Sequence, residues 1–194
     1  MKVLQRYTKE LVSEDGPCQI TIALQEATRQ GTATTKVSVT TLISESSDHP
    51  GAGSYTVDDA VSSYQVDCLL ELFNCLPVDT SQKKKYGSLC SERSYYCDSE
   101  GYMRAILESV VLEAGLVSDA DDVKAFSYMR FLHYSRAGSI LAPHVDLCRV
   151  DPFSNHRSTH TFILYLTDCE RGGETSLLDD VAGDCRSKVL SLSP

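Results

Sequence analysis

The first clear pattern of apolar and polar positions lies in the middle of the chain and has a helical period. Over 58–76 the apolar side chains recur every three or four residues, and the pattern stops at Pro77. Thr56 with Asp59 three residues later resembles a capping box, which is typical of a helix start. We therefore predict a helix over 58–76.

The pattern then changes twice along the chain. A second helical stripe begins near Asp98 or Ser99 and ends at Gly115, where a glycine commonly terminates a helix. Beyond residue 120 the period becomes two, which indicates strands with one buried face. Together with alternating segments near the amino terminus, this predicts strands over 18–24, 36–43, 124–135, 139–148, 158–167 and 174–178, with a short further strand at 188–192.

Helices followed by a run of strands favour an α+β fold with a mainly antiparallel sheet. We expect three regions. Residues 1–55 form a β-rich segment in which 18–24 pairs with 36–43 across a turn at 28–35, and they end in a polar loop. Residues 56–118 form a helical support, and 119–194 form the sheet domain.

Charge and composition exclude several classes of protein. The 194 residues carry 18 Lys and Arg against 27 Asp and Glu, a net charge of −9, so a nucleic-acid partner is not expected. No apolar stretch is long enough for a signal peptide or a membrane span, so we expect a cytoplasmic or nuclear protein without a membrane partner. The eight cysteines include no C-x-x-C pair, which argues against a zinc knuckle.

Candidate chemistry centres on His144 and Asp146. On a strand, residues two apart project from the same face, so an imidazole and a carboxylate converge on one point. Such a pair supplies two thirds of the 2-His-1-carboxylate triad that binds Fe(II) and leaves coordination positions open for O2 and a co-substrate.

The neighbours of this pair follow a recognisable order. They are Tyr134, Gly138, the run Pro143-His144-Val145-Asp146, the apolar segment from Thr161 to Leu166, and the turn Gly172-Gly173-Glu174-Thr175. In this order the chain resembles the 2-oxoglutarate- and Fe(II)-dependent dioxygenases, within them the prolyl 4-hydroxylase-like branch.

The resemblance implies a fold, a chemistry and roles for four residues. The fold would be a double-stranded β-helix, or jelly roll, with flanking amino-terminal helices. Fe(II) would bind to His144 and Asp146, while Tyr134 and Thr161 would lie at the co-substrate, although Tyr134 stands one residue further from Gly138 than is usual. Such enzymes convert 2-oxoglutarate and O2 to succinate and CO2 while hydroxylating a C–H bond, and ascorbate commonly keeps their iron reduced.

The chain also departs from this family. Relatives carry a second iron-binding histidine after the Gly-Gly-Glu-Thr turn, and then a Lys or Arg that pairs with the distal carboxylate of 2-oxoglutarate. Here no histidine follows His160. The jelly roll is therefore expected to be incomplete, with unpaired strand edges that favour self-association. Potential substitutes near Asp146 that do not match family positions are His156, His160, Asp151, Asp179, Asp180 and Asp184.

Three functions follow from these observations. The first is a dioxygenase that hydroxylates a side chain in a protein or peptide, for example a prolyl side chain. The second is a catalytically inactive remnant that serves as an interaction module, because the distal histidine and the Lys or Arg are missing. The third is an oxygenase that dealkylates nucleic acid, which the acidic net charge disfavours.

Overall fold

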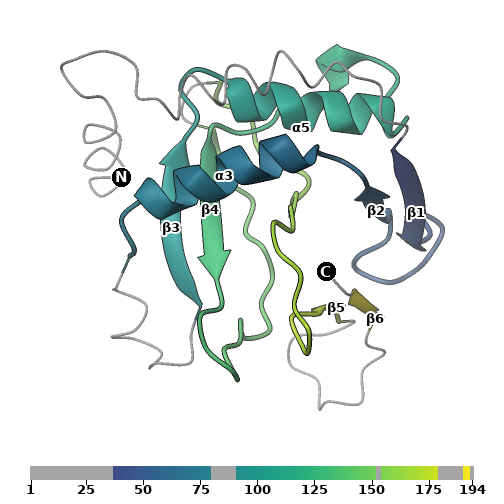
Figure 1. The fold of residues 1–194 in the computed structure, drawn as a ribbon. Helices are drawn as coiled ribbons and strands as arrows, with labels where there is room; N and C mark the ends of the chain where they lie inside the picture. The colour runs from purple at the N-terminus through teal and green to yellow at the C-terminus, as the bar shows by residue number, and fades with distance from the viewer. Residues whose placement is uncertain (1–36, 80–90, 152–153, 179–189, 193–194) are drawn as a thin grey trace.

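The computed structural model describes residues 37–79, 91–151, 154–178 and 190–192, the last of these by backbone alone. The fold is α+β, as predicted, and the residues just given contain two α-helices and short antiparallel strands (Figure 1). In chain order the elements are β1 (Ser38–Ile43), β2 (Ser54–Asp58), α3 (Ser63–Cys75), β3 (Glu92–Cys97), α5 (Tyr102–Glu113), the 3-10 helix η1 (Ala120–Asp122), β4 (Tyr128–His133), β5 (Thr175–Leu177) and β6 (Leu190–Leu192).

Within the described ranges the strands form three antiparallel pairs: β1 with β2, β3 with β4, and β5 with β6. The β1 strand lies inside the predicted 36–43, but its partner is β2, a strand that the sequence reading assigned partly to a loop. The other predicted partner, 18–24, lies outside the described residues. The jelly-roll arrangement stays a prediction, because these ladders show two-stranded pairs and not two facing sheets.

Helix α3 begins five residues later than predicted, and the predicted cap is wrong. Thr56 belongs to β2, where it pairs with Thr40, so it is not available to cap a helix. The capping box is instead formed by Ser62 and Gln65: the Gln65 N–H donates to Ser62 Oγ, 3.3 Å, and the Ser62 N–H donates to Gln65 Oε1, 2.7 Å. The two boxes have the same spacing, so the spacing alone does not distinguish them.

We expect Ser62→Ala to lower the free energy of unfolding by about 1 kcal/mol, because the N–H of Gln65 loses its acceptor. Ser63→Ala is the matched control, since Ser63 is the first helical residue and does not act as the cap. Urea denaturation of both variants measures the difference. Equal effects of the two substitutions would contradict the assignment of the cap.

Helix α5 ends as predicted, with Gly115 just beyond it in the left-handed region at φ +68°. Its start differs from the prediction, because the helix begins at Tyr102 and Gly101 at the N-cap has no side chain. The buried carboxylate of Asp98 takes over the cap: its Oδ2 accepts the N–H of Arg104 at 2.8 Å.

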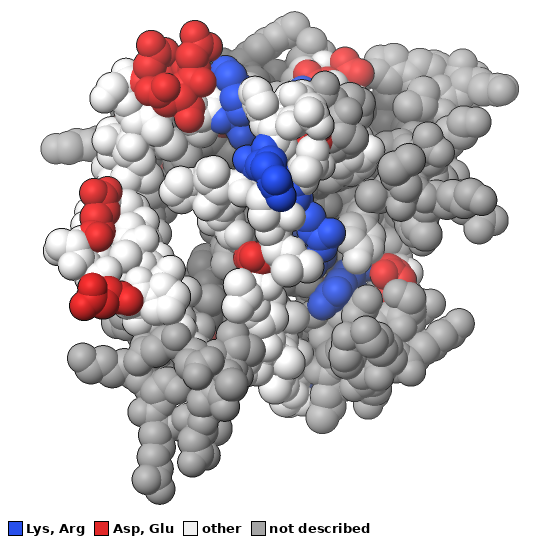
Figure 2. Space-filling view, turned by 180° about the vertical axis from the view of Figure 1, so that it is seen from behind, with Lys and Arg blue, Asp and Glu red and all other residues white. Residues whose placement is uncertain are grey.

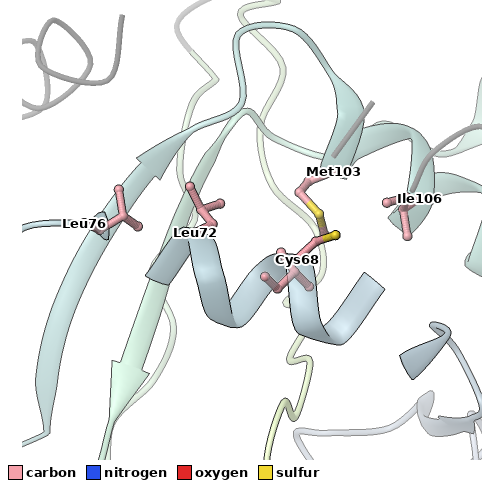
Figure 3. Close-up of a cluster of buried hydrophobic side chains, with 6 residues drawn as sticks. Cys68, Leu72, Leu76, Met103 and Ile106 are labelled. Atoms are coloured by element: carbon pink, nitrogen blue, oxygen red, sulfur yellow. The ribbon is translucent and has the colours of Figure 1, made fainter. Parts of the chain in front are cut away.

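The hydrophobic core lies between the two helices and the β3–β4 pair. Figure 3 shows side chains from α3 and α5 meeting at its centre. Alternate strand residues Tyr96, Met129 and Phe131 pack against this cluster, and so do Leu164 and Leu166. One face of the pair is therefore covered by α3, as Figure 1 shows. The buried members of the cluster are Cys68, Leu69, Leu72, Leu76, Met103 and Ile106.

The prediction of strands over 139–148 and 158–167 is wrong. The structure assigns no ladder to residues 139–148 or 158–167, although their composition alternates. Alternation shows that one face of a segment is more apolar than the other, but a ladder also requires a partner backbone in register. The predicted 124–135, 174–178 and 188–192 are confirmed as shorter strands, β4, β5 and β6. In the ranges described above, none of the helices has the length and apolar character that crossing a bilayer requires.

Candidate functional site

A tight turn brings the two halves of the candidate site together. The N–H of Ser158 donates to the carbonyl of Arg149 at 2.8 Å, and Val150 pairs antiparallel with Arg157. Inside the turn, Asp151 Oδ2 accepts both the N–H (3.0 Å) and the hydroxyl (2.6 Å) of Ser154. If the antiparallel register of Val150 and Arg157 is continued away from the turn, residue 146 lies opposite residue 161.

His144, Asp146 and Thr161 meet at that position. The Thr161 hydroxyl donates to Asp146 Oδ2 at 2.8 Å, and Asp146 Oδ1 lies 3.4 Å from His144 Nε2. The predicted convergence of the imidazole and the carboxylate is therefore present. Both side chains are about half exposed, 46% and 48%, so the pair is open to solvent.

The orientation of the His144 ring follows from its second nitrogen. Nδ1 lies 2.9 Å from the carbonyl of Ala142, which can only accept, so Nδ1 carries the proton. In the neutral ring Nε2 then presents a lone pair toward a carboxylate oxygen. Two facing acceptors are stabilised when a cation or a proton lies between them, and a histidine that binds a metal commonly donates its other N–H to a carbonyl.

The donor set fits two positions of an iron site. Ligands that are each about 2.1 Å from one ion lie roughly 3.0 Å apart at an octahedral angle and roughly 3.4 Å apart at a tetrahedral angle. The 3.4 Å between these two atoms is therefore slightly wider than the octahedral value. The Thr161 hydroxyl would be an outer partner that orients the carboxylate. Across the described part of the chain, no three His, Cys, Asp or Glu side chains gather as metal ligands.

The potential substitutes are placed elsewhere or not described. Asp151 is buried and binds Ser154 within the turn. His160 Nδ1 contacts the hydroxyl of its neighbour Thr159 at 2.9 Å, and His156 is exposed. Asp179, Asp180 and Asp184 lie outside the described residues.

Tyr134 lies among two arginines and another tyrosine. Burial raises the pKa of its phenol, Arg130 and Arg93 oppose that shift, and the phenol of Tyr165 adds to it. Tyr165 in turn donates to Thr175 Oγ1 at 2.6 Å. The structure thus places Tyr134 beside positive charge and brings Thr161 to the His144–Asp146 pair, while the co-substrate roles of both stay predictions.

The sequence reading missed two groups at this site. One is the carbonyl of Ala142, which fixes the His144 ring and has no signal in the sequence beyond its position before Pro143. The other is the pair of arginines Arg93 and Arg130, whose proximity depends on the register of β3 with β4. Arg130 lies in the predicted strand 124–135, but β3, which carries Arg93, was not predicted, so no sequence signal pointed to this pair.

Comparisons of the chain with protein-family models, with curated proteins and with solved structures find no match.

Proposed function

We propose that this protein is an Fe(II)- and 2-oxoglutarate-dependent dioxygenase with a jelly-roll fold that hydroxylates a side chain of a protein or peptide. The observation that carries the proposal is the facing pair of His144 Nε2 and Asp146 Oδ1, 3.4 Å apart, with Nδ1 held by a carbonyl. The motif order around this pair, from Tyr134 to Thr175, adds to it.

Each residue of the pair has a defined task in this proposal. His144 and Asp146 would hold Fe(II), and the Thr161 hydroxyl would keep one carboxylate oxygen turned away from the metal. The ion, with 2-oxoglutarate and O2, would supply the oxidising chemistry, with ascorbate as reductant. Because two protein ligands hold an ion less firmly than three, we expect weak metal affinity.

Metal titration tests the site directly. Mn(II), which resists oxidation, is titrated into the full chain and the free ion is followed by electron paramagnetic resonance. We expect His144→Ala and Asp146→Ala each to weaken binding by roughly 10-fold or more, since even an outer partner is worth about 10–100-fold. His160→Ala is the matched control, because that ring contacts Thr159 and not Asp146.

Two results would contradict the proposed site. Mn(II) affinity unchanged in both variants would exclude His144 and Asp146 as ligands. Tight stoichiometric binding by the unaltered chain would mean that a third residue completes the site. Activity is tested separately: succinate formation from 2-oxoglutarate should require Fe(II) and vanish in Asp146→Ala. Metal binding without succinate would instead favour the non-catalytic interaction module.

A further inference from the structure

One face of the β3–β4 pair is covered by α3, and the opposite face is called the outer face below. The outer face carries two arginines. Tyr96, Met129 and Phe131 pack toward the core, so the alternate positions project the other way. The register pairs Arg93 with Leu132 and Tyr95 with Arg130. The outer face is therefore made by Arg93, Tyr95, Arg130 and Leu132.

On this face the two arginines are diagonal neighbours. Arg130 stands two positions from Leu132, the direct partner of Arg93, and such diagonal positions are about 7–8 Å apart. Figure 2, seen from the side opposite Figure 1, shows Lys and Arg side chains running in a diagonal row across this side of the molecule. Asp and Glu side chains lie beside both ends of that row and near its middle.

Neither guanidinium has an ion-pair partner among the residues that the structure describes. The N–H at Arg93 Nε is also buried and has no hydrogen-bond acceptor there. A buried charged donor without an acceptor is costly, and two neighbouring guanidinium groups repel each other. An anion between the two guanidinium groups would relieve their repulsion. The planar fork of guanidinium N–H donors matches a carboxylate in particular.

Tyr134 supplies a third polar group to the same place. It continues the alternation Tyr128, Arg130, Leu132 beyond the end of β4, and its phenol lies within the electrostatic reach of both arginines. The phenol of Tyr165 is near it as well, on the segment that also carries Thr161. Tyr165 lies four residues from Thr161, which contacts Asp146.

We propose that Arg93 and Arg130, with the Tyr134 hydroxyl, bind a carboxylate on the outer face. The carboxylate belongs either to 2-oxoglutarate or to an acidic side chain of a peptide substrate. This inference deepens the proposed function. If the bound carboxylate belongs to 2-oxoglutarate, the inference rests on that function. Carboxylate binding itself uses neither His144 nor Asp146.

Calorimetric titration with glutarate tests the proposal, because this dicarboxylate lacks the 2-oxo group and needs no metal. We expect Arg93→Gln and Arg130→Gln each to weaken glutarate binding by roughly 10-fold or more, as loss of a charge-assisted hydrogen bond does. Lys124→Gln is the matched control. It removes one positive charge from a lysine that contacts Ala120 and Asp121, so glutarate affinity should be unchanged.

A second measurement guards against misfolding. Glutarate should shift the Nε–H resonance of Arg93 in the nuclear magnetic resonance spectrum of the unaltered chain. In addition, the exposed Arg130 can be replaced without opening the core.

A second titration uses an Asp-containing peptide and its Asn counterpart. Peptide binding that needs the Asp and both arginines, without glutarate binding, identifies the substrate as the source of the carboxylate.

The proposal is overturned if neither probe binds, or if Arg130→Gln leaves binding of both probes unchanged. Failure of the proposed function is seen separately. His144→Ala should weaken Mn(II) binding by roughly 10-fold or more and leave glutarate binding unchanged. Arg130→Gln should weaken glutarate binding by roughly 10-fold or more and leave Mn(II) binding unchanged. Glutarate binding that depends on Arg130 in a chain that binds no Mn(II) would support the carboxylate site and reject the metal site.

Discussion

Replacing Asp98 with alanine is expected to lower the free energy of unfolding by about 3–5 kcal/mol, the usual cost of breaking a buried charged pair. The Asp98 side chain is fully buried. Its Oδ2 accepts the Arg104 N–H at 2.8 Å and lies 3.9 Å from Arg104 Nε. The substitution therefore leaves the first turn of α5 without its cap and the guanidinium without its counter-charge.

Tyr96 adds to the expected loss. Its hydroxyl lies 3.4 Å from Asp98 Oδ1, and burial together with the Asp98 carboxylate raises the pKa of this phenol, so it stays protonated and donates. Urea denaturation should be compared with that of Asp121→Ala, an exposed carboxylate whose pair with Lys124 should contribute less than about 1 kcal/mol. Asp98→Asn, which keeps an oxygen acceptor, should fall between the two. A loss for Asp98→Ala no larger than that for Asp121→Ala would contradict this role.

Leu72→Ala is expected to cost about 2–5 kcal/mol of unfolding free energy. Leu72 is 2% exposed and lies in the cluster that joins α3 to α5 and to the β3–β4 pair. Truncation removes buried apolar surface and leaves a cavity that the surrounding helices and strands cannot fully close.

Leu112→Ala is the matched control for this substitution. It makes the same chemical change on α5 at a side chain that is 38% exposed, so we expect a smaller loss, about 1 kcal/mol or less. Thermal or urea unfolding of both variants measures the two losses. Equal destabilisation would show that the core does not centre on the α3–α5 contact.

The helices were largely predictable from the sequence because their information is local. A 3.6-residue stripe and Gly115 located α5 and its end, but the starts of both helices were misplaced. For α3 the reason is that Thr56 and Ser62 both open a capping-box pattern. The choice between them was made by the pairing of Thr56 with Thr40, a contact outside the helix.

The strands were less predictable because a ladder depends on a distant partner. Residues 139–148 and 158–167 alternate as strands do, yet the structure gives them no ladder. The convergence of His144 and Asp146 was still predictable, since it needs only residues two apart in extended chain. The place of Asp146 beside Thr161 depends on the turn at 149–158, and the proximity of Arg93 and Arg130 depends on strand register. No local pattern encodes either contact.

The position of α5 between β3 and β4 affects the order in which the chain folds. Glu92 and His133, which pair across the two strands, are 41 residues apart, so their meeting carries a loop-closure cost that neighbouring strands avoid. Helix α5 forms from contacts between near neighbours and shortens the intervening span when it does. We therefore expect pairing of β3 with β4 to follow formation of α5, and substitutions that weaken this helix to slow assembly of the face that carries Arg93 and Arg130.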